Sequence, residues 1–407
     1  MESTPPDTPP WRTRSVCLAS VAAADAVPIV LTAVLMGSLL CFTAGCCLEP
    51  PATTPQGADM RVEFVGALKA LDITVGDRPN TATSMPRLVA MATAPPSAGP
   101  RWAALAVREP TSVLVQGPLT PDGAPEQVGP TCEMAASLAF SADGTQMAVG
   151  CDSTQHGERA VELRHLSDGT RRRLRLTLKH GDSGSPLRLK APAFSADLSR
   201  AAVVAGLEAV ELFDMADGTR TAILPLAGPS HPTETPKVDA VAFAPSAQML
   251  AVAYHEGTVE LFDLTTQTAV AVLKPPKPDR GLALAFSPDG THLATASFWG
   301  NFHLWRLADG QLIHTDAAPN DDYGHHDLAW SPDGSQLYQV RAGQLVVRGA
   351  DGVCNATLTA APSGATVGGP PAAIVRGLSG VRPLGTDGLV LLEALGKGVR
   401  IVRLMRE

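Results

Sequence analysis

Leu284-Ala-Phe-Ser-Pro-Asp-Gly-Thr-His-Leu-Ala294 is the clearest copy of a phrase that occurs five times in this chain. Looser copies begin at Leu138, Ala193, Val241 and Leu328. The aromatic anchors of the five copies are Phe140, Phe194, Phe243, Phe286 and Trp330, so successive copies are 54, 49, 43 and 44 residues apart. A period of about 40–45 residues with strand-like chemistry is typical of the blades of a β-propeller.

Each copy has the chemistry of a strand followed by a tight turn. Alternating apolar residues before the aromatic predict an inner strand, and Ser-Pro-Asp-Gly predicts the turn because Pro presets φ and Gly accepts positive φ. A second and a third strand follow, as at 293–297 and 301–307, and after another polar turn comes a short fourth strand. Four strands per repeat make one blade.

The number of blades follows from the strands on both sides of these repeats. Residues 134–358 supply five blades, and 61–407 is the expected extent of the whole propeller. The flanking strands are predicted at Trp102–Val107 and Ser112–Val115 for a first blade, and at Ala372–Arg376, Gly388–Leu392 and Val399–Leu404 for a last one. Arg61–Gly66 or Leu71–Val75 would complete the last blade from the N-terminal side and so close the ring. We predict an all-β propeller of seven four-stranded blades, with six or eight as the alternatives.

Composition limits the classes of function. The chain of 407 residues is 45% apolar and has a net charge of −8, which argues against generic nucleic-acid binding. It holds none of the nucleophile-elbow, zinc-protease, phosphate-loop or dinucleotide motifs of common enzymes. Asp321–Asp327 is rich in metal-ligating residue types, but no second segment offers matching ligands. We therefore predict no catalytic residue, no metal and no cofactor.

The N-terminal segment predicts export. Arg12 and Arg14 precede the almost wholly apolar stretch Ala26–Gly45, and small residues lie directly before Cys46. This arrangement resembles a bacterial lipobox, which implies that Cys46 is lipidated. An uncleaved membrane anchor is the alternative, because the apolar stretch has about 20 residues. We predict a signal or anchor segment at 1–47, a Pro-rich tether at 48–60 and a propeller facing the periplasm or the exterior.

Two cysteines of the propeller lie near each other in the predicted first hairpin of a repeat. Cys132 comes just before an inner strand, and Cys151 ends the strand that pairs with it. If the hairpin turns at Asp143-Gly144, Cys151 faces position 136, and a bend would bring Cys132 within disulfide reach in an oxidising compartment. Two separate buried thiols are the alternative.

The repeats resemble those of the WD40 family. The closest match is Phe286–Ser297 followed by Leu304-Trp305, and Phe213-Asp214 and Phe262-Asp263 are similar to the family's Trp-Asp ending. The Gly-His pair that usually opens a repeat is mostly missing. The resemblance implies a propeller that binds other proteins and performs no chemistry.

Aromatic residues predict where such binding takes place. Phe298 and Trp299 lie in the loop between the second and third strands of the clear repeat, and the equivalent loop one blade earlier holds Tyr254 and His255. Loops of this class emerge on one rim of the ring, and exposed aromatic clusters are enriched in binding hot spots. We predict that these four residues bind a partner. The alternative is that Trp299 packs between blades.

We therefore expect an envelope-tethered, monomeric scaffold that binds a protein partner, with the membrane reached only through the N-terminal segment. Two other classes of function stay open. One is a small-ligand or glycan binder, including a TolB-like role suggested by the Ser-Pro-Asp-Gly phrases. The other is a propeller hydrolase with a metal in its channel.

Overall fold

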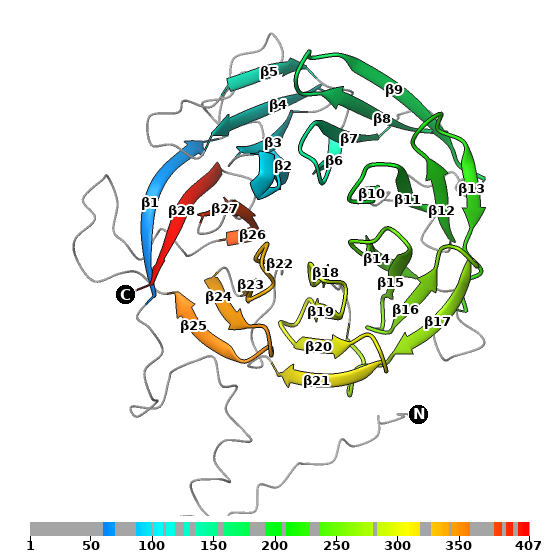
Figure 1. Ribbon diagram of the computed structural model, residues 1–407, viewed down its shortest axis with the longest axis vertical. Helices are drawn as coiled ribbons and strands as arrows, with labels where there is room; N and C mark the ends of the chain where they lie inside the picture. The colour runs from blue at the N-terminus through cyan, green and yellow to red at the C-terminus, as the bar shows by residue number, and fades with distance from the viewer. Residues whose placement is uncertain are drawn as a thin grey trace, which may run out of the picture. The chain divides into compact units, whose positions relative to one another are not determined.

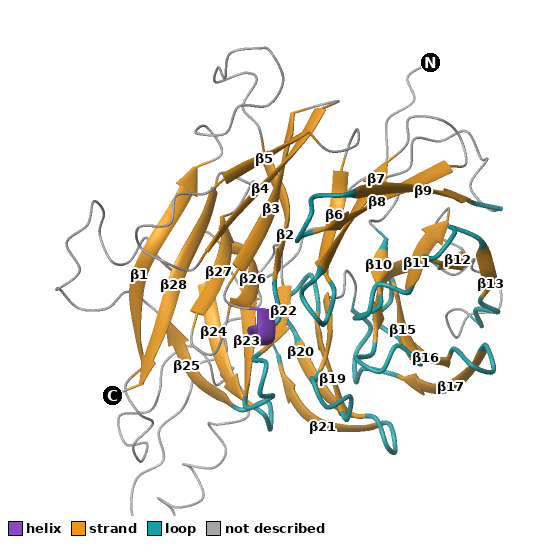
Figure 2. Cartoon of the chain, turned by 45° about the horizontal axis from the view of Figure 1, so that its top comes forward, coloured by secondary structure: helices purple, strands orange, loops and turns teal. Residues whose placement is uncertain are grey.

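The computed structural model describes residues 60–69, 87–98, 101–108, 111–118, 126–130, 135–152, 158–179, 192–205, 209–227, 237–279, 283–317, 327–341, 344–358, 378–384, 388–393 and 398–406. The described strands all belong to one compact unit, Ala44–Glu407. They form seven four-stranded antiparallel sheets arranged as blades in a ring (Figure 1). The predicted seven-bladed propeller is confirmed. The one described helical segment is the 3-10 turn η2 (Pro96–Ala98) (Figure 2).

Each blade runs from an inner strand beside the channel to an outer strand at the perimeter. Blade 1 contains β2 (Arg87–Thr93), β3 (Arg101–Arg108), β4 (Thr111–Pro118) and β5 (Glu126–Pro130), and blade 2 contains β6 (Ala135–Phe140), β7 (Gln146–Asp152), β8 (Glu158–His165) and β9 (Arg171–Thr177). Blade 3 contains β10 (Ala193–Phe194), β11 (Arg200–Ala205), β12 (Ala209–Asp214) and β13 (Arg220–Ile223), and blade 4 contains β14 (Val238–Phe243), β15 (Met249–Tyr254), β16 (Val259–Asp263) and β17 (Thr268–Leu273). Blade 5 contains β18 (Ala283–Phe286), β19 (His292–Ala296), β20 (Phe302–Arg306) and β21 (Gln311–Asp316), and blade 6 contains β22 (Asp327–Trp330), β23 (Gln336–Arg341), β24 (Gln344–Gly349) and β25 (Cys354–Leu358). Blade 7 contains β26 (Leu378–Leu384), β27 (Gly388–Glu393), β28 (Gly398–Arg406) and β1 (Met60–Lys69).

The ring is closed by a strand from the N-terminal side of the propeller. β1 pairs antiparallel with β28, from Met60↔Arg406 to Lys69↔Gly398. The prediction that Arg61–Gly66 completes the last blade is therefore confirmed, and Leu71–Val75 lies outside the described residues. Within the last blade, β27 and β28 contain the predicted strands at 388–392 and 399–404, whereas Ala372–Arg376 lies outside the described residues.

The repeated phrase forms the turn between the first and second strands of a blade. In blade 5 the Ser287 hydroxyl donates to Asp289 Oδ1 at 2.5 Å, and the amide of His292 donates to Ser287 Oγ at 2.9 Å. Gly290 has φ 70°, which only glycine adopts without strain. The same bonds recur at Ser141, Ser195 and Ser331. Blade 4 has Ala244 at the equivalent position and holds Ala247 at φ 57° instead.

The core lies between neighbouring sheets. Residues on one face of each blade pack against the next blade, as where Phe262 of blade 4 packs with Val204 of blade 3, and Trp305 of blade 5 with Ala251 of blade 4. These side chains are at most 4% exposed. Burial of apolar surface in every inter-blade layer therefore holds the ring together.

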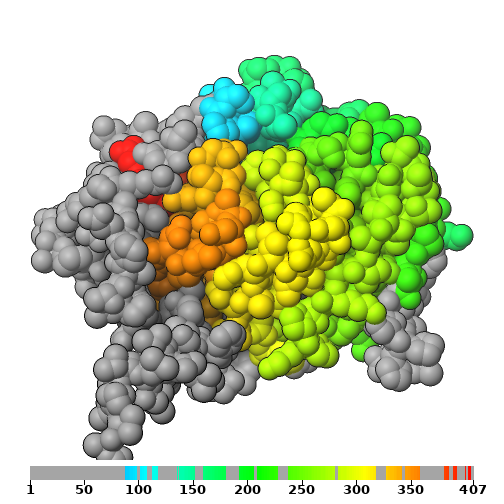
Figure 3. Space-filling model, turned by 60° about the horizontal axis from the view of Figure 1, so that its bottom comes forward, coloured from blue at the N-terminus to red at the C-terminus, as the bar shows by residue number. Residues whose placement is uncertain are grey.

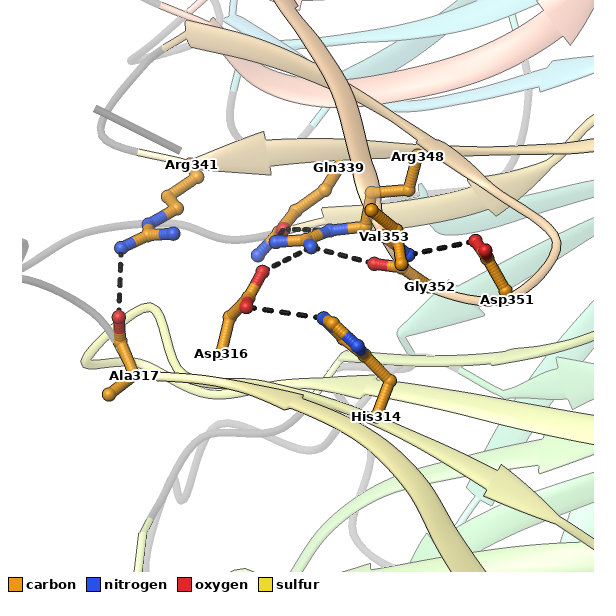
Figure 4. A network of polar contacts seen from close by, with 9 residues as sticks. All are labelled: His314, Asp316, Ala317, Gln339, Arg341, Arg348, Asp351, Gly352 and Val353. Atoms are coloured by element: carbon orange, nitrogen blue, oxygen red, sulfur yellow. Dashed lines mark hydrogen bonds and ion pairs between the residues drawn. The ribbon is translucent and has the colours of Figure 1, made fainter. Parts of the chain in front are cut away.

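One inter-blade layer also contains a polar network (Figure 4). Arg348 of β24 is fully buried and donates to the carboxylate of Asp316 on β21 and to Gln339 Oε1 at 2.8 and 3.0 Å. Its guanidinium carbon lies 4.0 Å from the centroid of the Phe302 ring. Burial acts to raise the pKa of Asp316, but the hydrogen bond with His314 and the charge of Arg348 outweigh it and hold that pKa well below its usual range. The Asp316 carboxylate is therefore held ionised beside Arg348, between blades 5 and 6.

Several sequence predictions concern segments that the structure does not describe. Cys46, the signal segment 1–47 and the tether 48–59 lie outside the described residues, as does Cys132. Cys151 is disulfide-bonded, and its pairing with Cys132 stays a prediction. Among the described residues, no helix is long and apolar enough to cross a membrane.

Candidate functional site

Two equivalent loops form the edge of blades 4 and 5 where we predicted partner binding. Tyr254–Thr258 joins β15 to β16, and Ser297–Asn301 joins β19 to β20. In each loop a glycine amide donates to a carbonyl three residues before it, at 2.9 Å, and the glycine has positive φ (94° at Gly257 and 79° at Gly300). The two loops are therefore rigid turns of the same design on the same rim.

A third segment lies between them, the connection Lys274–Asp279 from β17 to β18. The amide of Asp279 donates to the carbonyl of Glu256 at 2.9 Å, and its carboxylate accepts a hydrogen bond from Asn301 Nδ2. A Cβ on Gly257 would lie 2.8 Å from the Asp279 carbonyl oxygen, so only glycine permits this approach. We call the surface formed by 254–258, 274–279 and 297–301 the blade 4–5 rim.

Three of the four predicted binding residues present at least part of their side chains on this rim. Phe298 is 40% exposed and Trp299 is half-buried. The His255 side chain is 46% exposed, and its Nδ1 lies 3.0 Å from Asp239 Oδ2. The structure thus places an exposed phenylalanine and an exposed imidazole on neighbouring, connected loops.

The prediction that Tyr254 is an exposed contact residue is wrong. Its side chain is fully buried, in the layer between blades 3 and 4, and its hydroxyl donates to the carboxylate of Glu260. Both faces of β15 pack against neighbouring blades, and Tyr254 shares the face toward blade 3 with Val252. Val252 lies opposite Glu260 in the register, so the phenol and the carboxylate are on the same face. The buried carboxylate on β16 was the signal that this phenol has a partner inside the fold.

The rim also presents cations that the aromatic argument missed. Lys274 and Lys277 are exposed in the run Lys-Pro-Pro-Lys-Pro that ends at Pro278. Each proline fixes its own φ and restricts the residue before it, so the run is stiff. The alternation of lysines and prolines in this run was the sequence signal that could have revealed these cations.

The residue behind the rim is a buried histidine. His303 of β20 is 6% exposed and stacks on Trp305, with ring centroids 6.0 Å apart. Burial lowers the pKa of His303, and the nearby charge of Asp279 opposes this effect. His303 is thus a neutral part of the packed layer that supports the rim.

Comparison with known families gives a match on this part of the chain. The family model described as WD domain, G-beta repeat, matches residues 280–306, the repeat that runs through β18, β19 and β20. Together with seven four-stranded blades in a ring, this match decides the type of propeller. The ring is a WD40-type β-propeller. Comparison with curated proteins gives no significant match.

The matched repeat of this WD40-type propeller keeps features that some of the other blades lack. It keeps Trp305, whose Nε1 lies 3.4 Å from Thr295 Oγ1, and it keeps the full Ser-Pro-Asp-Gly turn. Blades 3 and 4 have Phe213 and Phe262 at the tryptophan position, and blade 4 lacks the turn serine. The Gly-His pair is missing, and Asp279 contacts Asn301 at the rim instead.

The described residues also line a cavity away from the rim. This cavity of about 190 Å³ lies at the edge opposite the rim, and none of its lining residues is charged. Its walls are Thr93, Ala94, Pro95, Pro96, Phe140, Ser141, Ala142, Ala196, Pro332 and Pro383. Within the described ranges, no group of three or more His, Cys, Asp and Glu side chains is placed to hold a metal ion; Asp321–His326 lies outside them.

Proposed function

We propose that this WD40-type propeller is a non-catalytic scaffold that binds a protein partner through the blade 4–5 rim. The main support for this proposal is that the Phe298 side chain is 40% exposed. Its loop is held by a backbone hydrogen bond within its own turn, from Gly300 to Ser297, and does not need the aromatic ring. A tight polar turn at this place needs no aromatic side chain. Exposed aromatic residues of this kind are enriched among residues that dominate binding energy.

The rim supports binding because it is pre-organised. Asp279 connects the two loops through its amide and its carboxylate, and the prolines between 275 and 278 stiffen the connection. A surface that is already ordered loses little conformational freedom when a partner binds. Binding at this rim therefore needs no rearrangement of the blades.

The charges on the rim indicate the chemistry of the partner. Lys274 and Lys277 are exposed on the connection that links the two loops of the rim, although the chain as a whole carries a net charge of −8. Local positive charge attracts and orients acidic surfaces. The partner that fits best has an apolar anchor for Phe298 with acidic residues around it.

We further propose that the N-terminal segment holds the propeller at a bacterial envelope through lipidated Cys46. The apolar stretch and the small residues before this cysteine support the proposal. Three acyl chains, as a mature lipoprotein has, anchor firmly, whereas a single chain gives only marginal binding. The substitution Cys46→Ser is expected to release the protein from membranes or to leave its precursor uncleaved. Membrane retention at the same mass as the wild type would favour an uncleaved anchor instead.

Crosslinking and affinity capture from envelope fractions test the scaffold proposal. Because Trp299 is half-buried, the single substitution Phe298→Ala is the cleaner variant. It should lower partner capture by about 2 kcal/mol of binding free energy or more while the free energy of unfolding stays within about 0.5 kcal/mol. Val353→Ala is the matched control, because Val353 is 46% exposed in the β24–β25 turn at the opposite edge. Equal capture by both variants would refute the rim as the binding surface.

A further inference from the structure

The outer strands of the propeller follow one another around its perimeter (Figure 1). The end of β17 meets the start of β21, since a Cβ on Gly310 in the β20–β21 turn would lie 3.5 Å from Leu273 Cδ2. In the space-filling view the yellow-green and yellow segments of these two strands lie side by side on the outer wall (Figure 3). Side chains of β17 and β21 that point outward therefore belong to one continuous surface.

β17 differs from the other outer strands in its side chains. It is the last strand of its sheet, so one backbone edge has no partner within the sheet. Its sequence Thr-Ala-Val-Ala-Val-Leu carries no charge and only one polar residue, whereas β9 holds four arginines, β13 one arginine, and β21 His314 and Asp316. β25 is also uncharged, but its Cys-Asn-Ala-Thr-Leu sequence is more polar. Natural edge strands usually carry charges that prevent pairing with other chains. β17 lacks this protection.

A bulge in the outer strand adds exposed apolar residues to this wall. In blade 4 the ladder passes from Leu261↔Ala271 to Phe262↔Ala269, so Val270 is the extra residue. The register of the neighbouring blades gives the equivalent bulge residues as Thr221 in blade 3, Ile313 in blade 5 and Asn355 in blade 6. The bulge residue is thus apolar in blades 4 and 5 and polar in blades 3 and 6.

The exposed apolar side chains of this wall are Val270 (55% exposed), Val272 (48%) and Ile313 (37%), which we call the outer-wall strip. Val270 and Val272 have the highest exposure of the large hydrophobic residues in the described part of the chain. Folding alone does not require them, because the polar residues Thr221 and Asn355 occupy the bulge in the neighbouring blades.

We propose that the outer-wall strip binds an extended segment of a partner protein that adds to the edge of β17. Every strand pair within the blades is antiparallel, and antiparallel addition is the more stable arrangement per residue. The partner segment carries β-branched apolar residues at alternate positions, which face Val270 and Val272. Lys274 and Lys277 follow β17 directly and are exposed, so an antiparallel partner places acidic residues before its apolar ones.

This site borders the rim at Lys274 and Lys277 but does not include Phe298, and it rests on a different observation, the uncharged edge with its exposed valines. It also sets the order of the partner's residues. In a segment of the opposite order, the acidic residues would lie beside Thr268, at the end of β17 far from the lysines.

The test uses the full chain and a labelled synthetic peptide in which a short acidic segment precedes alternating valine and threonine residues, with fluorescence anisotropy as the readout. The peptide should bind the wild type and bind its Val270→Lys variant roughly ten-fold more weakly or worse. Thr221→Lys, at the equivalent bulge of blade 3, is the control and should bind as the wild type does. The peptide of reversed order should also bind more weakly.

A second variant, Val270→Thr, keeps the β-branched shape and guards against a folding defect of the lysine variant. It should show an intermediate loss of affinity with an unchanged melting temperature. Equal affinity of the wild type and Val270→Lys would overturn the proposal. The proposal would also be overturned if the wild-type chain self-associated without peptide and Val270→Lys abolished this self-association. The strip would then bind a second copy of the chain. Phe298→Ala should leave peptide affinity unchanged, which separates this site from the rim.

Discussion

The carboxylate of Asp279 accepts a hydrogen bond from the side-chain amide of Asn301, and this contact joins the connection that leaves blade 4 to a loop of blade 5. Asp279 is 2% exposed, and its own amide donates to Glu256 at 2.9 Å. One residue thus links both loops of the proposed binding rim.

Loss of this link should weaken both the fold and the rim. Asp279→Ala removes the acceptor of Asn301 and is expected to lower the free energy of unfolding by about 1–3 kcal/mol. Urea denaturation measures the change. Asp309→Ala, which removes an exposed ion pair with Arg306, is the control and should stay within about 1 kcal/mol of the wild type. A loss no larger than that of the control would show that the link carries little energy.

The buried phenol of Tyr254 leads to a second prediction. Tyr254→Phe leaves the carboxylate of Glu260 without its hydroxyl donor inside the core and should destabilise the fold by about 1–3 kcal/mol. Tyr338→Phe is the matched control, because the Tyr338 hydroxyl donates to the neutral Gln336 Oε1 at 3.0 Å. The first substitution should lower the melting temperature more than the second. The reverse order would show that the hydrogen bond from Tyr254 to Glu260 contributes less to stability than the bond from Tyr338 to Gln336.

Tyr254 also shows where reasoning from sequence stopped. The loop position was predicted correctly from the spacing of the repeats. The direction of the side chain depended on the register of β15 against β16, which is set by packing between blades. The outer-wall strip was missed for a related reason, since the bulge at Val270 belongs to the pairing of two strands and has no local sequence signal.

Other features were predictable because their causes are local. The Ser-Pro-Asp-Gly phrases form the predicted turns, since Ser287, Asp289 and the backbone bond each other within six residues. Closure by Arg61–Gly66 followed from the need to pair the last free edge. Arg348 and Asp316, by contrast, lie in different blades, and only the folded ring brings them together.

The Arg348–Asp316 network should contribute strongly to the contact between blades 5 and 6. Arg348→Met leaves the Asp316 carboxylate without its cation and should cost about 3–5 kcal/mol. Arg382→Met breaks the more exposed pair with Asp327 and should cost about 1 kcal/mol or less. Chemical denaturation compares the two variants, and equal effects would contradict the role given to burial.

The turn aspartates predict how stability depends on pH. Hydrogen bonds from a serine hydroxyl and from a threonine amide lower the pKa of Asp143 and of Asp289 to about 2. Because each folded pKa lies below the unfolded value of 3.8, the ionised carboxylates stabilise the fold above about pH 4, and this contribution is lost as the pH falls toward about 2.

Ser287→Ala should raise the pKa of Asp289 toward its ordinary value and flatten the loss of stability between about pH 4 and 2. NMR titration of the Asp289 carboxyl measures the shift. Ser246→Ala in blade 4, where the turn has no aspartate, is the control and should leave the pH profile unchanged. An unchanged pKa of Asp289 in Ser287→Ala would show that the serine bond does not set it.

The scaffold account is tested most directly by site-specific photo-crosslinking in cells. A photo-reactive benzoylphenylalanine replaces Phe298 on the rim in one version of the full chain and Val353 at the opposite edge in another. We predict that the label at 298 yields a discrete crosslinked protein product, and that Asp279→Ala reduces the yield of this product. Two results would contradict the account: the same product formed with equal yield from position 353, or no crosslinked product from either position.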